Sequence, residues 1–118
     1  MKRVVVFEKN QDILDIVTHV LVEEGYKVKG FTSEGAFISY TSVAMPDLIL
    51  LDVIHITPEG TELCKKLKAL ESIKDIPVIV LSTHNKASQI KKICADEVIQ
   101  KPFDIHILLQ VVESHLAA

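Results

Sequence analysis

The chain has 118 residues, of which 48% are hydrophobic and 25% are charged. These values are ordinary for a soluble globular protein, and the length suits one domain spanning residues 1–118 with a sizeable core. The net charge of −3 argues against a nucleic-acid-binding surface, which would carry a basic patch. Neither a membrane-spanning run nor a signal peptide is recognisable, so we expect a cytoplasmic protein.

Strands and helices are expected to alternate in the first part of the chain. Residues 3–7 are β-branched and aromatic, which is typical of a buried strand. Asn10 is a good N-cap, and Gly25 is a typical stop for the helix that follows. Residues 26–30 alternate in polarity and predict a strand near the sheet edge, whereas residues 32–40 favour a weaker helix. The apolar residues that define the first helix are Ile13, Ile16, Val17, Val20 and Leu21.

The stretch Asp47-Leu48-Ile49-Leu50-Leu51-Asp52 is the centre of the pattern. Four apolar residues in a row suit a strand covered on both faces, as in parallel sheets with helices on each side. Pro46 cannot continue a helix and marks the entry to this strand. In such sheets ligands bind outside the carboxyl ends of the strands, so Asp52 is placed where chemistry is expected.

The second part of the chain repeats the alternation. A helix is predicted over residues 59–70, a buried strand over 78–82, a short helix over 86–94 and a strand over 98–101. Asp104 is predicted to cap a final helix that runs to Leu116. The helix at 59–70 is expected to turn Leu63, Leu67 and Leu70 inward and Lys65, Lys66 and Lys68 into solvent.

Five strand–helix repeats predict an α/β fold with a parallel sheet and right-handed crossovers. Polar groups follow four of the predicted strands, namely Glu8 with Lys9, Asp52, Ser82 and Lys101. The carboxyl ends of parallel strands meet at one edge of the sheet. We therefore expect these two carboxylates, one hydroxyl and two lysines to form a single site.

The chain resembles a response regulator receiver domain of the CheY-like type over nearly its whole length. The matching features are Asp52 after Leu-Ile-Leu-Leu, Gly60, Ser82 after Val-Ile-Val-Leu, and Lys101-Pro102-Phe103. The resemblance implies a flavodoxin-like (βα)5 fold with strand order 2-1-3-4-5 and helices on both faces. It also implies that a histidine kinase or phosphotransfer protein donates a phosphoryl group to Asp52, that Ser82 and Lys101 bind the phosphoryl oxygens, and that an unknown downstream protein reads the result.

The expected metal site departs from the family pattern. Receivers usually carry two adjacent acids after the first strand, which hold Mg²⁺ together with the phosphoacceptor; here these positions are Glu8 and Lys9. The resemblance implies Mg²⁺ on Glu8, Asp52 and the backbone carbonyl of Ile54, but an ammonium group cannot ligate a metal. One hypothesis is that Lys9 takes the place of Mg²⁺ and pairs with both carboxylates, so that Mg²⁺ binds weakly. The alternative is that Lys9 extends into solvent.

Two functional interpretations remain open. In the first, the chain is a regulatory phosphoacceptor rather than an enzyme, with at most self-catalysed phosphotransfer and dephosphorylation. In the second, it is a pseudo-receiver, an interaction module that works without phosphorylation. No output domain is expected within the 118 residues. Cys64 and Cys94 are expected to be free buried thiols, with a disulfide between them as the alternative.

Overall fold

The computed structural model describes residues 2–53, 58–82, 95–101 and 103–116. Its described strands form one five-stranded sheet in the order β2-β1-β3-β4-β5, and all neighbouring pairs are parallel. The strands are β1 (Arg3–Phe7), β2 (Lys27–Phe31), β3 (Leu48–Val53), β4 (Val78–Ser82) and β5 (Glu97–Gln100). The predicted class, strand order and edge position of β2 are confirmed.

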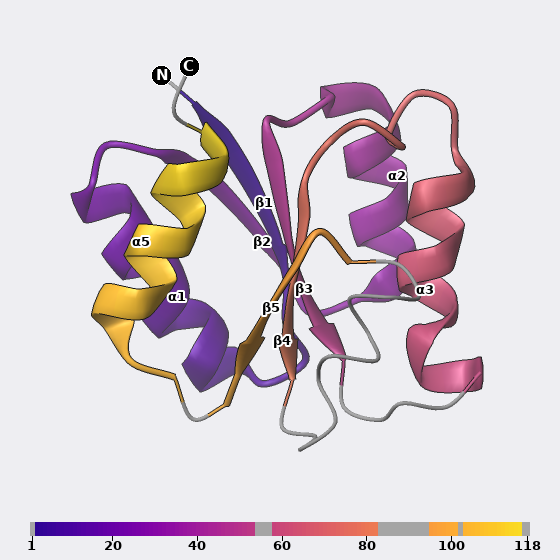
Figure 1. Ribbon diagram of the computed structural model, residues 1–118. Coiled ribbons are helices and arrows are strands. Elements are labelled where there is room, and N and C mark those ends of the chain that lie inside the picture. Colours follow the sequence, from indigo (N-terminus) through magenta and orange to yellow (C-terminus); the bar gives the residue numbers. More distant parts are fainter. Residues whose placement is uncertain (1, 54–57, 83–94, 102, 117–118) are drawn as a thin grey trace.

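Helices cover both faces of this sheet (Figure 1). α1 (Gln11–Glu23) and α5 (Ile105–Leu116) pack on one face, and α2 (Glu34–Ala44) and α3 (Pro58–Ala69) pack on the other. Alternate residues of each inner strand enter opposite cores, because successive side chains of a strand point to opposite faces. This explains why Leu48, Ile49, Leu50 and Leu51 are all buried.

Local signals in the sequence correctly place both ends of α1 and the start of α5, whereas α2 runs to Ala44, four residues beyond the expected end at Tyr40. The Asn10 side chain accepts hydrogen bonds from the backbone N–H groups of Asp12 (2.9 Å) and Ile13 (3.2 Å) and so caps α1. Gly25 has a φ of 93°, which only glycine adopts without strain. The Asp104 carboxylate accepts a bond from the N–H of His106 at 2.7 Å at the start of α5.

The inward face of α1 differs from the face that the apolar spacing predicts. Leu14, Val17 and Leu21 are buried, whereas Ile16 is 52% exposed. Leu14 lies against Gly30 of β2, where an added Cβ would come within 2.7 Å of Leu14 Cδ1. The space left by this glycine lets α1 seat Leu14 on the sheet, which turns Ile16 outward.

The prediction that Lys68 extends into solvent is wrong. Its ammonium group forms an ion pair with Asp96 and donates hydrogen bonds to the backbone carbonyls of Lys74 (3.3 Å) and Ile76 (3.0 Å). Asp96 also accepts a bond from the N–H of Val78 at 2.8 Å. Lys68 therefore ties the end of α3 to the loop before β4, whereas Lys65 and Lys66 are exposed as expected.

Cys64 is buried and disulfide-bonded, so the expectation of a free thiol there is wrong. Cys94 and the helix expected over residues 86–94 lie outside the described residues. Within the described ranges, every helix is too short or too polar to cross a membrane.

Candidate functional site

Two carboxylates lie side by side at the carboxyl edge of the sheet. Glu8 follows β1, and Asp52 is close to the end of β3; the register pairs Phe7 with Leu51, so the next residues along both strands are Glu8 and Asp52. Glu8 is 1% exposed and Asp52 is 8% exposed. Burying two carboxylates is costly unless a counter-charge accompanies them.

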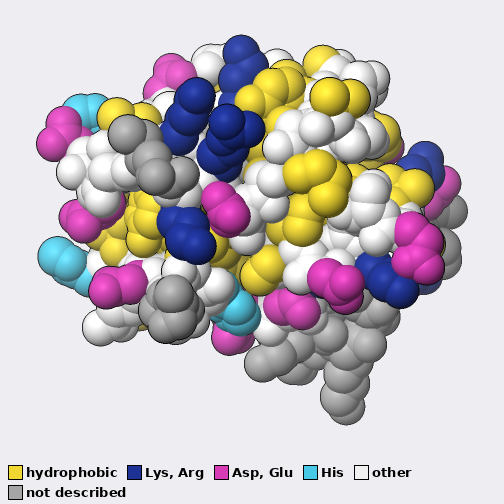
Figure 2. Space-filling view, turned by 90° about the horizontal axis from the view of Figure 1, so that it is seen from above, with side chains coloured by type: hydrophobic (Ala, Val, Ile, Leu, Met, Phe, Trp, Pro, Cys, Tyr) yellow, Lys and Arg dark blue, Asp and Glu magenta, His cyan; other side chains and the backbone are white. Residues whose placement is uncertain are grey.

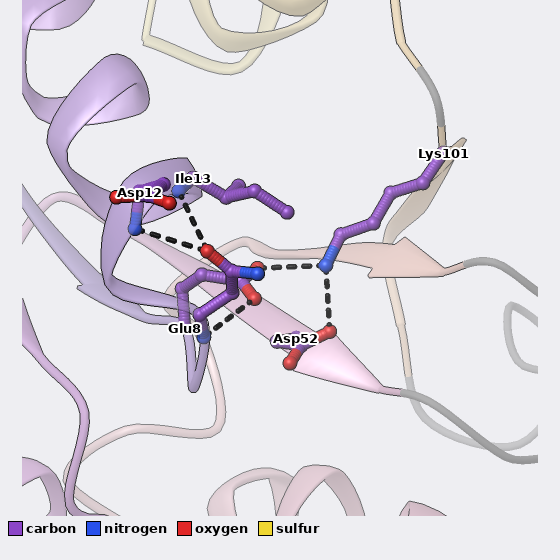
Figure 3. A network of polar contacts seen from close by, with 6 residues as sticks. Glu8, Asp12, Ile13, Asp52 and Lys101 are labelled. Carbon is purple, nitrogen blue, oxygen red and sulfur yellow. Dashed lines mark hydrogen bonds and ion pairs between the residues drawn. The ribbon is translucent and has the colours of Figure 1, made fainter.

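Lys101 supplies that counter-charge. Its backbone N–H donates to the Ser82 carbonyl at 2.6 Å, which fixes the chain after β5 beside the end of β4. The Lys101 Nζ lies 2.8 Å from Glu8 Oε2 and 2.9 Å from Asp52 Oδ1. Figure 3 shows the lysine reaching across the sheet edge so that one ammonium group bridges both carboxylates. The expected convergence of Glu8, Asp52 and Lys101 is thus present.

Glu8 is also held from the helix side. The backbone N–H of Asn10 donates to Glu8 Oε1 at 3.3 Å, and the side chain of Asn10 caps α1. The first turn of α1 and the end of β1 are therefore fixed by the same residue. Of the two Glu8 oxygens, one faces Asn10 and the other faces Lys101, so the orientation of the carboxylate is set from both sides.

Burial and charge act against each other in this site. Burial raises the pKa of Glu8 above its ordinary value, an effect that the hydrogen bond from Lys101 reduces and the nearby Asp52 charge reinforces. Burial alone would lower the pKa of the Lys101 amine, but the hydrogen bonds to Glu8 and Asp52 outweigh it and raise that pKa. Lys101 therefore stays protonated near neutral pH and keeps its positive charge beside the two carboxylates.

Ser82 lies on the neighbouring strand. The register pairs Val53 of β3 with Ser82 of β4, so Ser82 is one step beyond the level of Asp52, and it is fully buried. The structure thus places Ser82 at the same edge as Asp52.

Lys9 does not take the predicted place between the carboxylates. Its side chain is exposed, and the cation that contacts Glu8 and Asp52 in the described part of the chain is Lys101. The physical reason is that Lys101 already provides both hydrogen bonds, whereas a buried Lys9 would add a second desolvated charge. The hypothesis of a Lys9 bridge is therefore wrong, and the solvent-exposed alternative is confirmed.

The donor set for a divalent cation is small. Glu8 and Asp52 provide two carboxylates, and the described residues contain no cluster of three or more metal-ligating side chains. Mg²⁺ commonly binds through one or two carboxylates, several waters and substrate phosphates, so these two side chains fit a weak site. Ile54, whose carbonyl is the third expected ligand, lies outside the described residues.

The role of Asn10 beside Glu8 was not anticipated from the sequence. The sequence indicates that Asn10 caps a helix, but it does not reveal that the Asn10 backbone N–H also binds the Glu8 carboxylate. Chemically, the assembled site offers a buried carboxylate nucleophile, a protonated amine within hydrogen-bonding distance and a second carboxylate. This combination suits the transfer of an anionic group to Asp52, because a carboxylate can act as the nucleophile and the neighbouring ammonium group can neutralise the negative charge that is transferred.

Comparisons with known proteins agree with this geometry. Residues 4–113 match the family model for the response regulator receiver domain. The sensory transduction protein RegX3 of Mycobacterium tuberculosis is 27% identical over 121 residues, covering 98% of this chain and 51% of that protein. The nisin biosynthesis regulatory protein NisR of Lactococcus lactis is 28% identical over 117 residues, covering 97% of this chain and 50% of that protein. The chain therefore spans about half the length of the curated relatives it matches.

Solved structures show the same fold. The chemotaxis protein CheY4 of Vibrio cholerae superposes with a TM-score of 0.86 at 25% identity, covering 98% of this chain and 99% of that one. The receiver domain of a signal transduction histidine kinase from Syntrophus aciditrophicus has a TM-score of 0.86 at 27% identity, covering 99% of this chain and 91% of that one.

Proposed function

The chain belongs to the response regulator receiver domain family, and from this premise we propose that it accepts a phosphoryl group on Asp52 in two-component signalling. The observation that carries the proposal is the contact of Lys101 Nζ with Asp52 Oδ1 at 2.9 Å, at the edge of the sheet where ligands of such folds bind. The donor is a phosphohistidine of a histidine kinase or of a phosphotransfer protein.

The transfer exchanges one bond for another. A carboxylate oxygen of Asp52 forms a bond to phosphorus while the bond from phosphorus to the donor histidine nitrogen breaks, and the electron pair of that bond returns to the imidazole. Phosphoryl transfer depends mainly on positioning and charge neutralisation. The Lys101 ammonium group moves from pairing two carboxylates to pairing the phosphoryl oxygens, and the Ser82 hydroxyl is the second donor to those oxygens.

Glu8 and Asp52 would hold Mg²⁺ in this reaction. When bound, the ion neutralises charge on the phosphoryl oxygens. Lys9 replaces the third carboxylate that the family usually provides, so we propose that Mg²⁺ binds weakly in the free protein and depends on oxygens of the incoming phosphoryl group.

The output is a change in a protein-binding surface. Loss of the Lys101 contacts with Glu8 and Asp52, together with reorientation of Ser82, alters the ends of β4 and β5. We propose that a downstream protein in the cytoplasm recognises this change. The domain acts by regulated binding and not as an enzyme in its own right.

The test is incubation with a small phosphodonor, with Mg²⁺ and with a chelator, followed by intact-mass spectrometry. The wild type is expected to gain the mass of one phosphoryl group, more rapidly with Mg²⁺. Asp52→Asn is expected to gain none, while Asp47→Asn, at an exposed position just before β3, behaves like the wild type. Equal labelling of both variants would place the acceptor elsewhere.

A second candidate function is a pseudo-receiver that keeps one conformation without phosphorylation. The observation in its favour is that Lys101 already satisfies both buried carboxylates, while Lys9 takes the position of a usual metal ligand. Under this interpretation, the same incubation adds no phosphoryl mass to the wild type. Binding of the downstream protein would then be equally strong for the wild type and Asp52→Asn.

A further inference from the structure

A small pocket lies at the opposite end of the sheet from the phosphoryl site, where β1 and β2 begin. Its volume is about 70 Å³. Val5 and Val28 line it from the sheet, and Tyr40 and Ala44 line it from α2. Pockets that bind nucleotides or similar small molecules usually have volumes of several hundred Å³. This pocket is much smaller and has room for a single side chain.

The pocket exists because α2 covers only part of the sheet face. In the register of β1 and β2, Arg3 is paired with Lys27 and Val5 with Lys29. All four side chains therefore point to the same face of the sheet, which is the face that α2 covers. The Tyr40 ring packs against the Phe31 ring at a tilt of 48°, with 5.3 Å between the ring centroids. Next to that contact, Lys27 and Lys29 remain exposed on the sheet face.

Positive charge gathers around this pocket. Arg3, Lys27 and Lys29 all line it, and the Lys29 ammonium group lies 6.0 Å from the centre of the Phe31 ring. Asp47 lies next to Arg3, and its carboxylate accepts a bond from the backbone N–H of Arg3 at 2.8 Å. These three cations and the Asp47 carboxylate sum to a formal charge of +2 among the four residues, whereas the whole chain carries −3.

Exposed apolar side chains border the charged residues. Figure 2 looks onto this end of the molecule and shows Lys and Arg side chains next to hydrophobic ones. Val43 is 84% exposed, and Met45 and Tyr40 are also exposed. Met45, the residue that caps the end of α2, has a φ of 50°, a conformation that costs about 1 kcal/mol outside glycine, and its side chain is 50% exposed.

We propose that this surface, formed by Arg3, Lys27, Lys29, Tyr40, Val43 and Met45, docks an acidic peptide segment of a partner protein. One apolar side chain of the segment enters the pocket beside Tyr40. Neighbouring carboxylates pair with Arg3, Lys27 and Lys29, and the remaining apolar contacts involve Val43 and Met45. A free small anion would use the charges but leave the apolar border uncovered. The interaction is separate from phosphoryl transfer at Asp52 and does not require it.

The test selects peptides from a random library displayed on phage, using the whole chain as the target. Enriched sequences are expected to combine two or more acidic residues with an apolar one. Synthetic copies are then titrated into ¹⁵N-labelled protein, and shifts are expected at residues 3–5, 27–29 and 40–46. A selection that yields no enrichment, or yields basic or uncharged sequences, overturns the proposal.

Charge-reversal variants complete the test. The double variant Lys27→Glu, Lys29→Glu is expected to lower the affinity for the enriched peptides by about tenfold, which corresponds to roughly 1.4 kcal/mol. The matched control reverses Lys65 and Lys66, which are exposed on α3, and is expected to change affinity less than about twofold. Val43→Asp, at a position where the native side chain is 84% exposed, is expected to weaken binding as well. If both double variants lose affinity to the same extent, the peptides do not bind at a defined surface and the proposal is wrong. Asp52→Asn is expected to bind the peptides with the affinity of the wild type.

Discussion

Lys101 balances two buried carboxylates with one ammonium group, so its removal leaves two uncompensated charges. We expect Lys101→Met to lower the free energy of unfolding by about 3 kcal/mol near neutral pH. The loss is expected to be smaller at pH 5, because removing the hydrogen bond from Lys101 raises the pKa of Glu8 further and the folded variant takes up a proton there as the pH falls. Urea unfolding at both pH values measures this difference.

Lys65→Met is the matched control for that experiment. Lys65 is exposed on α3, and its replacement is expected to change stability by less than about 0.5 kcal/mol at either pH. A loss for Lys101→Met that is the same at both pH values would show that the carboxylates do not depend on its charge.

Glu8 has its own pH signature. Its pKa in the folded protein is raised above 4.5, mainly by burial. A carboxyl group with a raised pKa contributes stability that is present below its unfolded pKa and is lost as the pH rises through its folded pKa. We therefore expect Glu8→Gln to lose less stability than the wild type as the pH increases from 4.5 toward 7. Unfolding curves across this range test the sign, and a steeper decline in the variant would contradict it.

Lys9 is an exposed cation at a position where the resemblance to receiver domains implies an acid. Replacement by aspartate adds a third carboxylate beside Glu8 and Asp52 and removes a positive charge. We expect Lys9→Asp to raise Mg²⁺ affinity by at least about tenfold, measured by calorimetry. Lys9→Ala removes the charge without adding a ligand and is expected to give a smaller increase. Equal affinities for Lys9→Asp and the wild type would exclude a metal site at this position.

Two helix starts differ in a way that can be measured. Asn10 accepts two backbone hydrogen bonds at the start of α1, whereas Ser33 at the start of α2 makes no side-chain cap bond. We expect Asn10→Ala to cost about 1 kcal/mol and Ser33→Ala to cost only a few tenths. Thermal or urea unfolding of both variants gives the comparison, and similar losses would contradict the assigned caps.

The order of the elements was predictable because each one carries a local signal. The apolar run before Asp52 indicates a strand covered on both faces, Asn10 and Asp104 indicate helix starts, and Gly25 indicates a helix end. Parallel topology then brings Asp52 and Lys101 to one edge without further information. This is why fold and site were largely predictable from residues far apart in the chain.

The missed features depend on contacts between elements. The apolar spacing of α1 does not reveal that Gly30 accommodates Leu14 and turns Ile16 outward. Lys68 lies among lysines on α3, and only the folded chain brings its ammonium group to Asp96. The competition between Lys9 and Lys101 for the same carboxylates is likewise decided by geometry that composition does not contain.

At the scale of the whole molecule, the two ends of the sheet differ in character. The carboxyl edge gathers Glu8, Asp52 and Lys101, and the opposite edge carries a cationic surface with apolar neighbours. The relatives RegX3 and NisR are about twice as long as this chain.

Asp52 and Lys101 are 49 residues apart in the chain, yet their side chains form one interacting site. A double-mutant cycle with Asp52→Asn, Lys101→Met and the combined variant measures their coupling in unfolding free energy. We predict a coupling of at least about 1 kcal/mol, and near-additivity for Asp52→Asn with Lys65→Met. If the effects of the Asp52 and Lys101 substitutions simply add, the two groups are not in contact and the proposed phosphoryl site is not assembled.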